Sequence, residues 1–183
     1  GYYRGFYYDN SLHFVGTLGG ASSSVFDIND AGQMTGGAEL SDGRRHAFRS
    51  SGTSLIDLGT VGSPLVNNSG IAINASGQIA GNLDISHVMF HDGTTMFDLG
   101  TLGGFEAQAA DINDSGQIVG ESYITGDSAY HAFLYAGGQM TDINDLIDPS
   151  SGWLLQHAEA INNKGQIIGH GFHEGAALHF LLT

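Results

Sequence analysis

A nine-residue phrase returns four times in this 183-residue chain and decides its fold. It reads INDAGQMTG at 28–36, INASGQIAG at 73–81, INDSGQIVG at 112–120 and INNKGQIIG at 161–169. Its asparagines are 45, 39 and 49 residues apart. Periods of this length are typical of propeller blades and other repeat arrays. The chain is therefore predicted to be an array of four similar units.

Each unit carries the same order of short apolar segments. A stretch ending in Ile-Asn is followed by the turn, by Gly-Gln-Ile-x-Gly, by an aromatic segment and by an Asp-Leu-Gly-Thr-like segment. The aromatic segments centre on Phe48, Phe90, Phe133 and Phe180. No helical period is sustained, and alternating or β-branched clusters bounded by Gly, Asn, Asp and Ser favour strands. We predict an all-β fold, a β-propeller of four four-stranded blades built from repeats of roughly 43 residues.

The repeats are set at approximately 11–52, 53–94, 95–137 and 138–183, within a single domain that leaves residues 1–10 over as one strand. Turn chemistry accounts for the repeated phrase. Asn at the first position and Gly at the fourth, where φ is positive, are typical of a hairpin closed by a glycine bulge. The predicted turn residues are Asn29 and Gly32, Asn74 and Gly77, Asn113 and Gly116, and Asn162 and Gly165.

A calcium loop is the alternative interpretation of the phrase. Oxygen-ligand loops need carboxylates at fixed positions, and two copies offer them, at Asp27 with Asp30 and at Asp111 with Asp114. The other two copies have Ala or Asn at these positions. Within the turn only Asn and Gly recur in all four copies, which favours a structural role, with Ca²⁺ at the two acidic copies as the alternative.

Composition and charge argue against several classes of binding partner. Five basic residues against 19 acidic ones give a formal charge of -14, which repels nucleic-acid phosphates. No apolar run approaches the roughly 18 residues of a membrane span, and the absence of cysteine excludes disulfides and thiol chemistry. The chain begins with glycine and has no signal peptide, so we interpret it as a processed or trimmed part of a longer protein.

Three motifs together resemble the bacterial extracellular HAF repeat. They are DLGTLGG at 98–104, DINDSGQIVG at 111–120 and HAFLY at 131–135, with a second His-Ala-Phe at 46–48. The second unit departs from the pattern with HVMF and the fourth with LHF, so the histidines are not expected to form a repeated chemical site. The last unit resembles the final repeat of family members that carry a PEP-CTERM sorting signal. The resemblance covers essentially the whole chain and implies export from a bacterium to the cell surface or matrix, without implying a reaction.

No catalytic motif of a known class occurs in the chain. The closest histidine pairs, His87 with His91 and His170 with His173, have spacings that do not bring two ligands together on a strand. Glutamates that could serve a polysaccharide-degrading enzyme lie at unrelated places in the repeat, so this activity is only a third hypothesis. They are Glu39, Glu106, Glu121, Glu159 and Glu174.

One segment, 144–155, departs from the short links between units. It carries Asp145, Asp148 and the single tryptophan, Trp153. An indole beside carboxylates can stack on a sugar and bind its hydroxyls. The alternative is that Trp153 simply packs the last blade.

The aromatic strand occurs five times, once more than a closed four-bladed ring needs. Either the first copy or the last, around Phe180, is left over, and both ends are candidates for the same place in the ring. We set residues 1–10 as the extra strand, with Tyr2, Tyr3, Phe6, Tyr7 and Tyr8. An exposed apolar strand can pair with the sheet edge of another chain and build oligomers or filaments. It can also fold back on its own blade or belong to a missing upstream one.

These observations predict a secreted, non-enzymatic module that binds at the cell surface or in the extracellular matrix, with a glycan as the expected ligand. A structural subunit that assembles by exchange of the terminal strand is the alternative.

Overall fold

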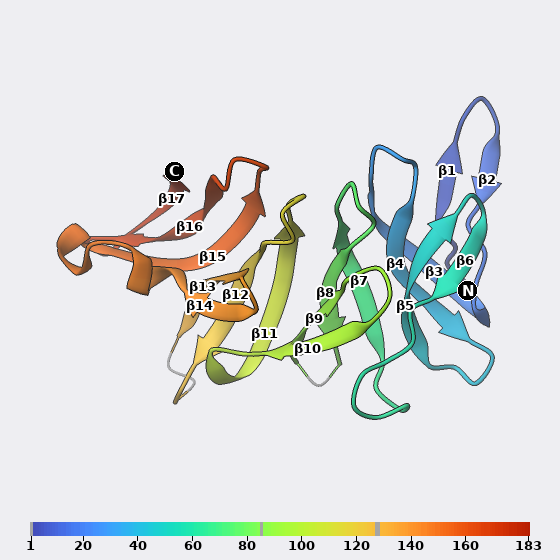
Figure 1. Ribbon diagram of the computed structural model, residues 1–183, viewed down its shortest axis with the longest axis horizontal. Helices are drawn as coiled ribbons and strands as arrows, with labels where there is room; N and C mark the ends of the chain where they lie inside the picture. Colours follow the sequence, from blue (N-terminus) through green and yellow to red (C-terminus); the bar gives the residue numbers. More distant parts are fainter. Residues whose placement is uncertain (1, 85, 127–128) are drawn as a thin grey trace.

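The computed structural model describes residues 2–84, 86–126 and 129–183, so Gly1 of the expected N-terminal strand lies outside it (Figure 1). The described chain is almost entirely β-structure. A hairpin of β1 (Phe6–Tyr8) and β2 (Leu12–Phe14) precedes the repeated sheets. The first sheet is β3 (Gly19–Ile28), β4 (Met34–Leu40), β5 (Arg45–Ser51) and β6 (Ser54–Asp57). The second is β7 (Asn68–Ile73), β8 (Ile79–Leu83), β9 (Val88–His91) and β10 (Met96–Gly100).

The third sheet is β11 (Gly103–Ile112), β12 (Ile118–Ile124), β13 (Tyr130–Ala136) and β14 (Gln139–Asp142). Two 3-10 helices, η1 (Ile143–Leu146) and η2 (Pro149–Ser151), lead to the last sheet. That sheet is β15 (Trp153–Ile161), β16 (Ile167–His173) and β17 (Ala176–Leu182). Strands are antiparallel and neighbour one another in chain order in every sheet. The all-β fold is confirmed, with four strands in each of three sheets and three strands in the last described sheet.

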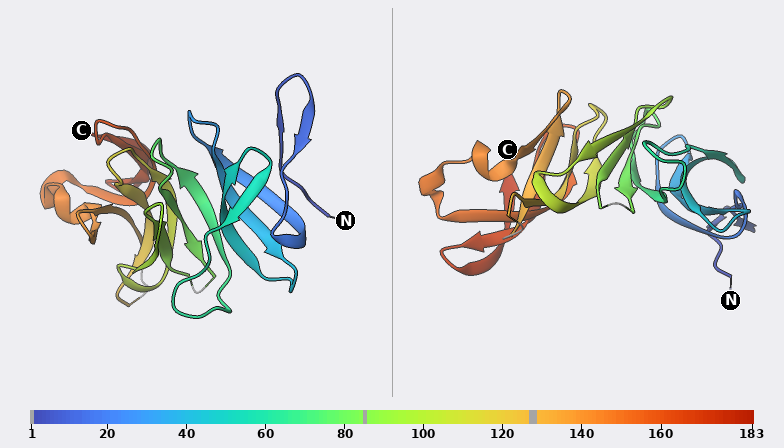
Figure 2. Two further views of the ribbon diagram at one scale, coloured as in Figure 1. Left: turned by 45° about the vertical axis from the view of Figure 1, so that its right-hand side comes forward. Right: turned by 90° about the horizontal axis from the view of Figure 1, so that it is seen from below.

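The sheets follow one another along the molecule, and the first and last lie at opposite ends (Figures 1 and 2). Within the described residues, each sheet packs against the next, and no strand of β3–β6 packs closely against β15–β17. The described chain is thus an open row of blade-like sheets. None of the helices in the described part is long and apolar enough to cross a membrane.

The second, third and last sheets each have a face of large side chains that packs on the sheet before it. In the third sheet this face includes Ile112, Ile118 and Phe133, which pack on Ala72 and Ala80 of the second sheet. The opposite face, with Val119 and Ala132, packs on the last sheet. Burial of these apolar faces between successive sheets is the main stabilising term of the array.

The final glycine of each repeated phrase faces the large residue of the third strand. Gly120 pairs with Phe133 and Gly36 with Phe48. A Cβ at Gly120 would lie 2.0 Å from the carbonyl oxygen of Gln108 and 2.8 Å from the Phe133 ring. Glycine therefore recurs here because the neighbouring strand approaches too closely for a side chain.

The strand predicted around Phe90 is present as β9, but Phe90 does not occupy the position of Phe48 and Phe133 within it. Met89 pairs with Gly81 and occupies that buried position. Phe90 points to the other face, because side chains alternate along a strand.

Candidate functional site

A row of four turns along one side of the array is the most regular polar feature of the molecule. In each turn, the first residue accepts a backbone hydrogen bond from the fourth, as Asn113 does from Gly116 at 3.0 Å. The turn glycines have φ between 74° and 77°, a conformation that glycine adopts without strain. They are Gly32, Gly77, Gly116 and Gly165.

The asparagine side chain holds its turn from inside. Asn113 Oδ1 accepts hydrogen bonds from the backbone amides of Ser115 at 3.0 Å and Gln117 at 3.1 Å. Its Nδ2 donates to Gln117 Oε1 at 2.7 Å. The same bonds recur in the other three turns. The glutamine of the phrase is therefore a partner of the asparagine, a role that the turn analysis of the sequence missed.

The asparagines also connect successive sheets. Asn29 Nδ2 donates to the Asn74 carbonyl at 2.9 Å, Asn74 to Asn113 at 3.0 Å, and Asn113 to Asn162 at 3.1 Å. Among the described residues, the Nδ2 of Asn162 donates only to Gln166 within its own turn. This series of hydrogen bonds, which we call the asparagine ladder, runs from Asn29 to Asn162 in one direction and ends at the last sheet.

The predicted calcium carboxylates belong to the same ladder. Asp27 accepts the backbone amide of Ile73 at 2.7 Å, and Asp111 accepts that of Ile161 at 2.8 Å, in each case from the next sheet. Burial raises the pKa of the Asp111 carboxyl. One oxygen of each carboxylate, Oδ2 of Asp27 and Oδ2 of Asp111, therefore accepts a hydrogen bond between sheets.

The turn-tip carboxylates have different surroundings. Asp114 accepts hydrogen bonds from the amide of Ala75 and the side chain of Asn163. Asp30 lines a shallow hollow of about 320 Å³ along the four turns. Within the described ranges, no group of three His, Asp or Glu side chains is placed to hold a metal ion.

Three sheets share a His–carboxylate pair that joins the third strand, or in the second sheet the residue just before it, to the fourth strand. His46 Nδ1 lies 2.9 Å from Asp57 Oδ1, and His87 Nδ1 lies 3.0 Å from Asp98. His131 contacts Asp142 in the same way. The expectation that the histidines form no repeated chemical site stays a prediction, but the hydrogen-bonded contact itself recurs, because the second sheet supplies His87. The spacing of 11 residues from His to Asp was visible in the sequence.

The remaining candidate histidines are not brought together. His91 is buried, and its Nδ1 accepts a hydrogen bond from the Gly93 amide at 3.1 Å. His170 lies 2.8 Å from Glu159, while His173 packs against the Trp153 ring at 4.9 Å. Their contacts serve the sheets locally.

The candidate glutamates are likewise held apart in separate contacts. Glu39 accepts the backbone amides of residues 21 and 22, and Glu121 contacts His157 of the next sheet. Glu106 accepts a hydrogen bond from the Tyr130 hydroxyl, and burial raises the pKa of this hydroxyl to about 12. Glu174 lies in the turn before β17. The contacts give none of them a partner carboxylate for glycoside cleavage.

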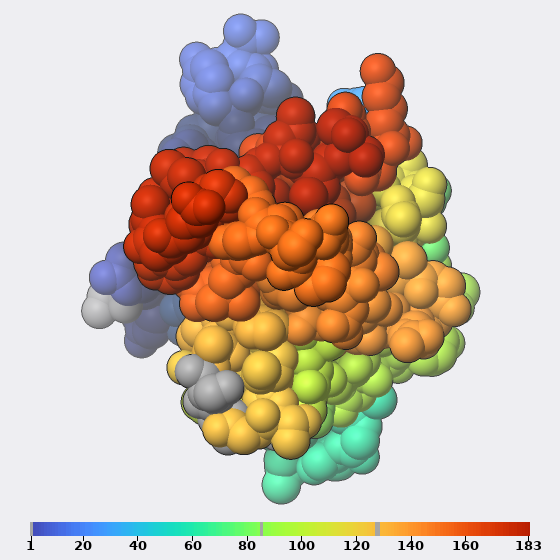
Figure 3. All heavy atoms as spheres, turned by 90° about the vertical axis from the view of Figure 1, so that its left-hand side faces the viewer, coloured from blue at the N-terminus to red at the C-terminus, as the bar shows by residue number. Residues whose placement is uncertain are grey.

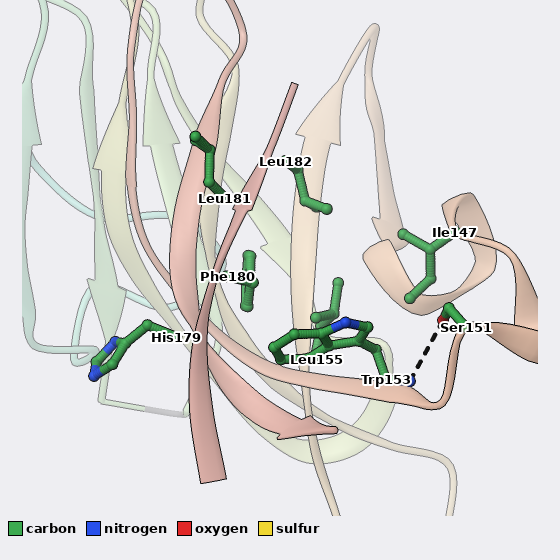
Figure 4. A pocket seen from close by; sticks show the side chains of 8 residues that line it. All are labelled: Ile147, Ser151, Trp153, Leu155, His179, Phe180, Leu181 and Leu182. Carbon is green, nitrogen blue, oxygen red and sulfur yellow. Dashed lines mark hydrogen bonds between the residues drawn. The ribbon is translucent and has the colours of Figure 1, made fainter. Parts of the chain in front are cut away.

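Trp153 lies half-buried in the last sheet, with its ring 6.3 Å from that of Phe180. It lines a mainly apolar hollow of about 280 Å³ (Figure 4). The other lining residues are Ile147, Ser151, Leu155, His179, Phe180, Leu181 and Leu182. Asp148 and Asp145 do not line it. Asp148 instead caps η2 by accepting hydrogen bonds from Ser150, which lowers the pKa of its carboxyl.

Phe6, Tyr7 and Tyr8 lie in a projecting hairpin, whereas Tyr2 and Tyr3 precede it and the Tyr3 carbonyl accepts a hydrogen bond from the Ser23 amide of β3 at 2.9 Å (Figures 1 and 2). Tyr2, Tyr3, Phe6 and Tyr8 are all at least 59% exposed. Tyr7 is half-buried and stacks on His13, with the ring centres 4.7 Å apart. The extra strand therefore pairs with residues 12–14, and most of its aromatic surface stays uncovered.

A comparison with models of known protein families found no match, and neither did a search of curated proteins.

Proposed function

We propose that this chain is a non-enzymatic repeat module, exported by a bacterium, that acts as a structural subunit at the cell surface or in the extracellular matrix. The proposal combines the resemblance to HAF repeats with the open ends of the array. The asparagines of the repeated phrase hold one sheet to the next, because Asn74 donates a hydrogen bond to Asn113 and Asn113 donates one to Asn162.

One observation carries the structural role. Ile168 of the last sheet is 48% exposed, whereas the residues at its position in the three preceding sheets are fully buried by the sheet that follows. They are Thr35, Ala80 and Val119. Figure 3 shows the last sheet facing outward at this end of the molecule. A repeat interface left open is the kind of apolar surface that a partner covers.

The test is the molar mass in solution, by size exclusion with light scattering, together with electron microscopy of large particles. A structural subunit gives a mass well above 19.2 kDa that rises with concentration. A strictly monomeric protein at high micromolar concentration would contradict this role.

A glycan-binding module is the second candidate, favoured by the position of Trp153 at an open hollow. The matched test measures binding to acidic and neutral polysaccharides by the wild type and by Trp153→Ala. Binding that Trp153→Ala abolishes, while the unfolding transition stays cooperative, would support it. Equal binding by both proteins would exclude a role for Trp153.

A further inference from the structure

The N-terminal hairpin is the second half of a repeat unit. Its sequence LHFVGTLGG at 12–20 aligns with MFDLGTLGG at 96–104. The register agrees as well, because Phe6 pairs with Phe14 as Phe48 pairs with Asp57. In this alignment, β1 is a third strand and β2 is a fourth strand.

The last sheet has three strands in the part of the chain that the structure describes. β5, β9 and β13 each pair on both edges, whereas among the described residues β17 pairs only with β16. Its outer edge therefore presents unpaired backbone groups, which can add another strand. The hollow lined by Trp153, Phe180 and Leu182 opens beside β17 (Figure 4).

In each complete sheet, the fourth strand contributes one apolar side chain to the cluster around the third strand. These side chains are Leu55, Met96 and Met140. Leu12 occupies the same position in the alignment, yet it is 53% exposed. In the register of the complete sheets, Leu12 would lie opposite Leu182, next to the hollow.

Two positions depart from the residue types of the repeat, one in the last sheet and one in β2, and the two changes match each other. Where complete sheets pair a histidine of the third strand with an aspartate of the fourth, the last sheet has Leu178 and β2 has Phe14. Both are exposed, at 46% and 57%. A hydrogen-bonded His–Asp pair has thus been replaced on both strands by an apolar one, which makes β2 a better match for β17 than any fourth strand of the complete sheets.

We infer that β2 of a second copy of this chain fills the empty fourth-strand position beside β17. The predicted register pairs Phe14 with Phe180, His13 with Leu181 and Leu12 with Leu182. The hairpin can stay intact, because β2 pairs with β1 on one edge only, and its apolar face, Phe6, Tyr8, Leu12 and Phe14, then lies on the side of the hollow.

The partner is a second copy because the hairpin and the last sheet lie at opposite ends of the chain (Figure 1). A contact between unlike surfaces repeats head to tail and yields filaments or rings. The inference rests on the proposed structural role and names its interface.

The experiment compares four proteins by the concentration at which they assemble: wild type, Phe14→Asp, Leu178→His, and the double variant. Phe14→Asp should raise the midpoint concentration about tenfold or more, because it places a carboxylate against leucine without a partner. The double variant recreates the His–Asp pair of the complete sheets and should recover most of the loss. Both residues are exposed in the single chain, so the unfolding midpoint should stay close to wild type.

Cysteine trapping tests the register, since the chain has no cysteine of its own. Mixed His13→Cys and Leu181→Cys proteins should form a disulfide on mild oxidation, whereas His13→Cys with Ala177→Cys should not. The inference is overturned if assembly persists unchanged in Phe14→Asp without rescue, which leaves the structural role standing. It is also overturned if a single chain carrying both His13→Cys and Leu181→Cys closes on itself as a monomer. A wild type that never assembles contradicts the structural role itself.

Discussion

The side-chain amide of Asn113 donates a hydrogen bond to the main-chain carbonyl of Asn162, 3.1 Å away and 49 residues further along the chain. The same side chain closes its own turn through two backbone amides. One residue type therefore satisfies both local and inter-sheet groups, and the repeat of the phrase follows from the repeat of both tasks. A turn without an inter-sheet task could use Asp or Ser in its place.

Asn113→Ala and Asn162→Ala separate these two tasks. Both variants lose the bonds within the turn, but only Asn113 is buried and bonded to the next sheet. We expect Asn113→Ala to lower the free energy of unfolding by about 1–2 kcal/mol more than Asn162→Ala. Urea unfolding measures the difference. Equal losses would mean that the inter-sheet bond adds nothing to stability.

Gly120→Ala should be among the more costly single-methyl additions in this chain. The added Cβ would meet the Gln108 carbonyl at 2.0 Å, so the strands must separate. We expect a loss of about 3 kcal/mol in the free energy of unfolding. Gly43→Ala is the control, because its positive φ is strained but no atom lies within 4 Å, and it should cost about 1 kcal/mol. A smaller loss for Gly120→Ala than for the control would refute the steric explanation.

The repeated phrase made the sheets predictable because turn chemistry and side-chain alternation are local. The hairpin at Asn113 and the pairing of Ile112 with Ile118 needed no information beyond their own nine residues. The register of the third strand was harder to predict from the sequence. In HVMFH, either Met89 or Phe90 could fill the buried position, and only the pairing with Gly81 decides it.

The contacts between sheets were less predictable, since they join residues about 40–50 positions apart. The role of Gln117 as a partner of Asn113 requires the folded turn. The His–Asp pairs leave a constant spacing in the sequence, but the departure at Leu178 gains its meaning only beside Phe14. In the described residues the predicted four-stranded last blade is a three-stranded sheet, which departs from the prediction, and the hollow beside it could not be foreseen either.

Stability should fall in mild acid because of His91. Burial and the charge of Arg49 lower the pKa of this imidazole, against an opposing effect of Asp92. Since its folded pKa lies below the ordinary value of 6.5, the unfolded chain binds the proton more readily. The stability that the neutral ring contributes is present above pH 6.5 and is lost as the pH falls through the folded pKa.

His91→Asn should flatten this part of the pH dependence, because an asparagine can accept the Gly93 amide without titrating. His179→Asn, which removes a histidine at an exposed position, is the matched control. Urea unfolding between pH 5 and pH 8 measures both. An unchanged slope in His91→Asn would assign the acid sensitivity to other groups.

Calcium should leave the thermal midpoint of this protein unchanged. The carboxylate oxygens of Asp27 and Asp111 that the sequence offers for a cation each accept a backbone amide. A cation would compete with these bonds, and it would lower the pKa of Asp111, which burial raises. Ligands that bind only the folded state raise the midpoint with concentration, so a calcium titration with magnesium as control decides the point. A saturable rise with calcium alone, lost in Asp111→Asn, would establish the cation site instead.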